Sequence, residues 1–148
     1  MDLKQRLEND LKDALRAGDE IRKSTIRLAL TSIKLSQVEK GSALDDNAII
    51  GLIQKEIKGR KESITDAEKA NRPAMIEDLL KEIKVLEGYL PQQLSSDELN
   101  QLITQAIQET GSTSITDMGK VMKVLIPQVQ GRAPNDQISA AVRSMLQQ

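Results

Sequence analysis

A proline stop in the middle of the chain constrains the fold more than any other feature. Gly88-Tyr89-Leu90 ends one helical pattern, and Pro91 cannot continue it. Ser95, with Glu98 three residues later, is a capping-box signature for a new helix. The segments on both sides of this break have the period of helices, and none alternates as a strand would. We therefore expect an all-α fold with two small domains, residues 1–90 and residues 91–148.

Glycine and proline residues divide these domains further. The N-terminal domain is expected to be a bundle of about four helices, over residues 2–17, 19–39, 47–70 and 73–90. The C-terminal domain is expected to hold three shorter helices, over residues 96–109, 115–126 and 136–147. Pro127 is expected to close the middle one of these three, because a proline in a helix removes a backbone hydrogen bond.

The residue types that are missing exclude several classes of active site. The chain has no Cys and no His, so thiolate nucleophiles, Ser-His-Asp triads and Cys/His zinc sites cannot form. It also lacks a nucleotide-phosphate loop. We therefore expect no catalytic centre within the chain, no cofactor and no metal. A Ser-Lys dyad and a metal site made of carboxylates alone are the alternatives.

Charge and aromatic content limit nucleic-acid binding. The formal net charge of the chain is -1, and Tyr89 is its only aromatic residue. Strong non-specific binding needs many phosphate contacts, and binding of single strands needs aromatic stacking platforms. We expect no DNA partner.

No N-terminal segment has the apolar core of a signal peptide, and no stretch is apolar enough for a membrane span. The sequence therefore predicts a cytoplasmic protein without a membrane partner.

In the N-terminal domain, the helix over residues 19–39 is expected to lie centrally in its bundle, because small or apolar residues cover most of its circumference. Lys23, Arg27 and Lys34 gather within about 40° on the remaining face. They would form either an anion-facing ridge or ion pairs with acidic neighbours.

Arg60 falls within the apolar stripe of the next helix, where a charge needs a partner or must reach water. We expect Glu82 to be this partner, and a contact between Arg60 and a ligand is the alternative.

In the C-terminal domain, the apolar residues of the middle helix share one face and predict a core. They are Met118, Val121, Met122 and Leu125. Lys120 and Lys123 project from the opposite face, and Arg143 opposes the apolar face of the last helix. Arg132 lies in the turn at Gly131. Composition alone describes these four as surface charges.

Two signatures in this order resemble the GatB/YqeY family: YLPQQLSSDEL from residue 89 and TDMGKVMKVLIPQVQGRA from residue 116. The resemblance continues upstream in STIRLALTSIK, IKGRKESI and ANRPAMIEDLLKEIKVLEGYLP, and so covers nearly the whole chain. The chain departs from the family pattern after Ala133, where Pro134 and Asn135 precede Asp136.

The resemblance implies a C-terminal three-helix module like the tail of the GatB subunit of tRNA-dependent amidotransferases, which contacts tRNA. It implies a tRNA-binding or accessory role, with Lys120, Lys123, Arg132 and Arg143 as contacts. The resemblance also links the chain to carbon–nitrogen ligases that use glutamine as amide donor, an activity we assign to the whole amidotransferase complex. The alternative is a helical adaptor that binds a protein partner through the face of the helix over residues 19–39 or through a groove between the domains. An amide-transfer enzyme in its own right is a third possibility.

Overall fold

The computed structural model describes residues 1–129 and 131–147. These residues form seven α-helices and one short 3-10 helix, with no strand among them, so the expected all-α fold is confirmed. The elements are α1 (Leu3–Ala17), α2 (Glu20–Lys40), α3 (Asp46–Lys69), α4 (Pro73–Glu87), α5 (Ser96–Thr110), η1 (Ile115–Asp117), α6 (Met118–Val129) and α7 (Asn135–Leu146). No helix within the described ranges is both long and apolar enough to cross a membrane.

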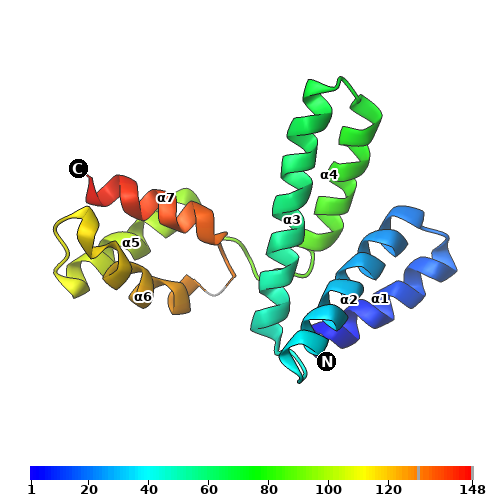
Figure 1. Ribbon diagram of the computed structural model, residues 1–148, viewed down its shortest axis with the longest axis horizontal. Helices are drawn as coiled ribbons and strands as arrows, with labels where there is room; N and C mark the ends of the chain where they lie inside the picture. Colours follow the sequence, from blue (N-terminus) through cyan, green and yellow to red (C-terminus); the bar gives the residue numbers. More distant parts are fainter. Residues whose placement is uncertain (130, 148) are drawn as a thin grey trace. The chain divides into compact units, whose positions relative to one another are not determined.

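The chain divides into two compact units, Met1–Leu90 (unit 1) and Pro91–Gln148 (unit 2). In unit 1, α1 and α2 form one antiparallel hairpin, and α3 and α4 form another that is inclined to it (Figure 1). Their facing sides bury one core, made of Leu3, Leu7, Ile26, Ala29, Ile33, Ile49, Ile53, Ile57, Ile83, Leu86 and Tyr89.

Tyr89 ties the end of unit 1 to its beginning. The Tyr89 hydroxyl donates a hydrogen bond to the Asp10 carboxylate of α1. The guanidinium of Arg6 lies 5.1 Å from the centre of the Tyr89 ring, and Arg22 Nη2 lies 3.7 Å from Asp10 Oδ1. Burial, and after it the bond to Asp10, raises the pKa of Tyr89 far above its ordinary value.

The expectation that α2 lies centrally holds for only part of its surface. Ile26, Ala29 and Ile33 are buried, but Leu28 is 52% exposed and Leu35 is 61% exposed. The expectation was wrong here because apolar periodicity shows which side chains could be buried, and the number of neighbouring helices decides how many are. Within unit 1, no other helix packs against the outer side of α2.

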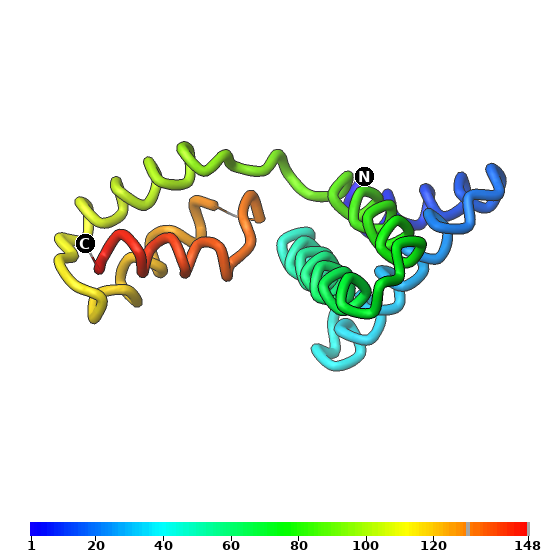
Figure 2. The backbone as a smooth tube through the Cα atoms, turned by 90° about the horizontal axis from the view of Figure 1, so that it is seen from above, coloured from blue at the N-terminus to red at the C-terminus, as the bar shows by residue number. Residues whose placement is uncertain are grey.

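In unit 2, α5 runs alongside α6 and α7 (Figure 2). The core of unit 2 is made of Leu99, Ile103, Ala106, Val121, Leu125, Val129, Ala133, Ile138, Val142 and Leu146. The predicted capping box is present at the start of α5: Ser95 Oγ accepts from Glu98 N at 3.1 Å, and Glu98 Oε1 accepts from Ser95 N at 3.1 Å. This reciprocal pair fixes where α5 begins.

Helix α6 does not end before Pro127, as the sequence had predicted, but passes through it to Val129. A proline removes one hydrogen bond to the preceding turn, and here only a few residues of helix follow it. Burial of Val129 against the core of unit 2 favours this continuation over a stop at Ile126.

Candidate functional site

The outer face of α6 carries two of the predicted contact residues. Val121 and Leu125 are buried on its inner face, and Lys120 and Lys123 are exposed on the opposite one. Lys120 Nζ lies 3.8 Å from Asp117 Oδ1, with 72% of the Lys120 side chain exposed. An ion pair this open contributes little to stability, so Lys120 remains available to a ligand.

Asp117 has a structural task of its own beside Lys120. Its Oδ2 accepts from Thr113 N at 3.1 Å, which holds the loop in front of η1. This backbone hydrogen bond is the main cause that lowers the pKa of Asp117, and Lys120 adds a smaller effect. The carboxylate therefore stays ionised and is directed toward the loop.

Arg143 lies on α7, exposed, while Ile138, Val142 and Leu146 of the same helix are buried. Neither Lys123 nor Arg143 makes an ion pair within the part of the chain that the structure describes. Both side chains can therefore meet an external anion without first breaking an internal contact.

Arg132 differs from the other three, because it joins two parts of unit 2. Arg132 Nε donates to the Gln92 carbonyl at 3.0 Å, and the Arg132 carbonyl accepts from Leu94 N at 2.8 Å. Beside it, Gln93 Nε2 donates to the Gly131 carbonyl at 3.0 Å. We call these three hydrogen bonds the clasp. Sequence reasoning did not find it, since its partners are about 40 residues apart.

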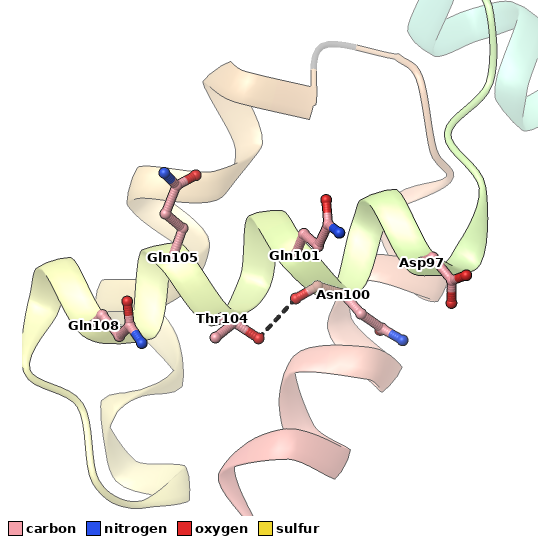
Figure 3. Close-up of a pocket in the computed structure, with 6 residues that line it drawn as sticks. All are labelled: Asp97, Asn100, Gln101, Thr104, Gln105 and Gln108. Carbon is pink, nitrogen blue, oxygen red and sulfur yellow. Dashed lines mark hydrogen bonds between the residues drawn. The ribbon is translucent and has the colours of Figure 1, made fainter.

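A shallow hollow of about 460 Å³ lies along the outer face of α5 (Figure 3). It is lined by Asp97, Asn100, Gln101, Thr104, Gln105 and Gln108. All six side chains are polar, and amides both donate and accept hydrogen bonds. Sequence reasoning missed this face, although the polar residues recur at helical spacing.

The second predicted set, Lys23, Arg27, Lys34 and Arg60, is not gathered into one site. Lys23 Nζ pairs with Glu20 Oε2 at 2.8 Å, and Arg27 and Lys34 are exposed on α2. Arg60 is 8% exposed on α3. Arg60 lines a groove between α2 and α3. Lys23, Arg27 and Lys34 do not line it, and its α2 wall is formed by Ser32, Leu35, Ser36 and Glu39.

Arg60 is held by two carboxylates. Its Nη1 lies 2.7 Å from Glu56 Oε2, and its Nε lies 3.4 Å from Glu82 Oε1 on α4. Glu82 is the partner predicted from the sequence. Glu56 is engaged on its other side as well, because Ser32 Oγ donates to Glu56 Oε1 at 2.9 Å. The network joins α2, α3 and α4 at the floor of this groove, which has a volume of about 560 Å³.

Comparison with known proteins gives a family and a set of relatives. The family of YqeY-like proteins matches residues 4–146. Altered inheritance of mitochondria protein 41, mitochondrial, of Lachancea thermotolerans is 32% identical over 143 residues, covering 92% of this chain and 76% of the relative. The protein of the same name from Kluyveromyces lactis is 39% identical over 84 residues, covering 56% of this chain and 45% of the relative. The one from Pyrenophora tritici-repentis is 30% identical over 132 residues, covering 86% of this chain and 71% of the relative.

These names contradict the predicted cytoplasmic location, because the relatives are called mitochondrial proteins. The prediction was wrong in its logic as well as its outcome. A missing signal peptide or span argues against secretion and membrane insertion, but it does not distinguish the cytoplasm from the interior of an organelle.

The family match spans nearly the whole chain and includes both units. The segments that carry the resemblance come from both units. The chain therefore belongs to the family of YqeY-like proteins.

Proposed function

We propose that the protein binds tRNA through unit 2, as an accessory to tRNA-dependent amidation and without a catalytic centre of its own. The observation that carries the proposal is the outer surface of α6 and α7. There Lys120, Lys123 and Arg143 are exposed, while the apolar faces of the same helices are buried in the core of unit 2.

The proposed binding depends on short-range contacts between unit 2 and the RNA. Unit 2 holds four basic and five acidic side chains, so no field of one sign attracts RNA from a distance. Recognition would depend on a few phosphate contacts from Lys and Arg. The amides of the α5 face suit the 2′-hydroxyl groups of an RNA minor groove.

The test reverses the two lysines of α6. In Lys120→Glu/Lys123→Glu, tRNA affinity measured by filter binding at several salt concentrations should fall. The slope of log affinity against log salt should become shallower by up to about one unit for each phosphate that the variant no longer neutralises. Melting temperature should barely change, because both charges are exposed.

Unit 1 offers a matched control. Lys81 and Lys84 of α4 are exposed and have the same spacing as the α6 pair. Lys81→Glu/Lys84→Glu changes the net charge equally and should leave the salt slope unchanged. Equal losses of affinity in both double variants would show a general charge effect and reject the α6 surface. Absence of wild-type binding at low salt would reject tRNA binding and favour the adaptor.

A further inference from the structure

The exposed face of α2 has the residue spacing of a coiled-coil seam. Ser24, Leu28, Thr31, Leu35 and Val38 are all exposed, and they follow one another at intervals of four and three residues. This spacing is that of the a and d positions, through which one helix packs against another. Leu28, Leu35 and Val38 are 52%, 61% and 73% exposed. We call these five residues the α2 seam.

The seam is distinct from the face that folds unit 1. Ile26, Ala29 and Ile33 already bury the inner side of α2 against its neighbours. Apolar side chains on the outer side add nothing to that core, and each exposes area that a partner helix could bury.

The charges beside the seam select the kind of partner. Arg27 and Lys34 directly precede Leu28 and Leu35, which puts both cations at g positions along one flank. On the other side lies the groove between α2 and α3, where Lys55 is an exposed cation and Glu39 an exposed acid. Glu56 also lines this groove, but its two oxygens are occupied by Arg60 and Ser32. Among these exposed residues, Arg27, Lys34 and Lys55 are cations and Glu39 is an acid.

Gly59 in the groove gives a second reason to expect a close partner. It lies inside α3, is exposed, and a methyl group added to it would meet nothing within 4 Å. A glycine in a helix interior destabilises the helix relative to alanine, and unit 1 itself gains no packing from it. The missing side chain leaves room for the backbone of a partner helix to come close to α3 at Gly59.

We propose that α2 binds an amphipathic helix of a partner protein, apolar along its seam and acidic along the flank that faces Arg27 and Lys34. The partner helix packs on Leu28, Leu35 and Val38, and its edge enters the α2–α3 groove beside Gly59. This interaction goes beyond the proposed binding of RNA and uses the other unit.

A second copy of the chain fits the seam less well. An antiparallel pair of α2 helices would set Arg27 and Lys34 against the same cations of the other copy. A parallel pair would give Lys34 the acid Glu39 and leave Arg27 facing a serine. An acidic partner satisfies both cations.

The test uses the full chain and two synthetic peptides of about three heptads with Leu at a and d. One peptide has Glu at e and g and the other has Lys, and like charges keep each peptide from pairing with itself. We expect the acidic peptide to bind at least about tenfold more tightly than the basic one in a titration calorimeter. Arg27→Glu/Lys34→Glu should reverse this preference, and Leu35→Glu should abolish binding of the acidic peptide.

Leu80→Glu is the matched control, because Leu80 of α4 is 55% exposed and lies off the seam. It should bind the acidic peptide as the wild type does. Gly59→Leu should weaken binding without lowering the melting temperature. Absence of binding, equal affinity for the two peptides, or equal losses in Leu35→Glu and Leu80→Glu would overturn the proposal. A wild-type dimer in sedimentation that Leu35→Glu makes monomeric would instead assign the seam to a second copy. Unchanged tRNA affinity in Leu35→Glu would separate this surface from the proposed RNA site.

Discussion

At the scale of single residues, Tyr89 offers a direct measurement, because it is the only aromatic residue and its ionisation can be followed alone. Its pKa is raised by burial and by the hydrogen bond to Asp10. We expect the folded chain to show little tyrosinate absorbance at pH values slightly above 10, where the tyrosine of an unfolded chain is more than half ionised.

The sign of the effect on stability follows from the same shift. Above about pH 10 the unfolded chain has released the tyrosine proton and the folded chain retains it, so the unfolded state binds fewer protons. The free energy of unfolding is therefore expected to fall as pH rises through this range and to keep its full tyrosine contribution below it. A titration of the chain in concentrated urea is the control, and half-ionisation near pH 10 in the folded chain as well would contradict the buried hydroxyl.

Three contacts show what could be predicted from the sequence at this scale. The Ser95–Glu98 capping box spans three residues, and local chemistry alone predicted it. The Tyr89–Asp10 bond joins residues 79 apart, and no local pattern distinguishes Asp10 from the other acids of α1. Arg60 and Glu82 are an intermediate case, because a charge inside an apolar stripe demands a partner and few acids can reach it.

At the scale of helices, Arg60 links α3 to α4 and can be tested by removing its charge. Arg60→Met keeps an apolar stem in the core and leaves the carboxylates of Glu56 and Glu82 without their shared cation. We expect the free energy of unfolding to fall by about 2–4 kcal/mol, because the buried partner of a partly buried ion-pair network has been removed.

The double variant Arg60→Met/Glu82→Leu distinguishes the effect of the missing ion pair from the effect of a changed side-chain shape. It removes one of the stranded carboxylates and should recover part of the stability in urea denaturation. If the double variant is less stable than Arg60→Met by the full effect of Glu82→Leu alone, the two side chains are not coupled.

The helices also show where periodicity stops being informative. The sequence located the helices of the described residues to within a few positions, since glycine and proline mark their ends. It misjudged the exposed side of α2, because the number of helices around it depends on the arrangement of the two hairpins. The α2–α3 groove shares this dependence, because its walls come from two helices, whereas the hollow on α5 is lined by one helix alone.

For the whole molecule, the clasp predicts where unit 2 can be cut. A fragment of residues 91–148 keeps the bonds that Gln92, Gln93 and Leu94 make with Gly131 and Arg132, and a fragment of residues 95–148 cannot form them. We expect the longer fragment to be helical on its own and the shorter one to be less stable by about 1–3 kcal/mol.

Thermal melts followed by circular dichroism measure this difference. Arg132→Ala in the longer fragment is the control, and it should produce part of the same destabilisation, since it removes the bond from Nε but keeps the backbone bond to Leu94. Coincident melting curves for the two fragments would show that the clasp does not stabilise unit 2. A longer fragment without helical signal at low temperature would show that unit 2 needs unit 1 to fold.

The clasp also determines how unit 2 responds to a mechanical load. The chain enters at Pro91 and is fastened to the Gly131–Arg132 turn before it reaches the first residue of α5. Tension applied through the connecting segment is therefore borne first by the bonds at Gln92, Gln93 and Leu94. The capping box at Ser95 carries no force until those bonds part, so under tension α5 is shielded from unwinding at its first turn.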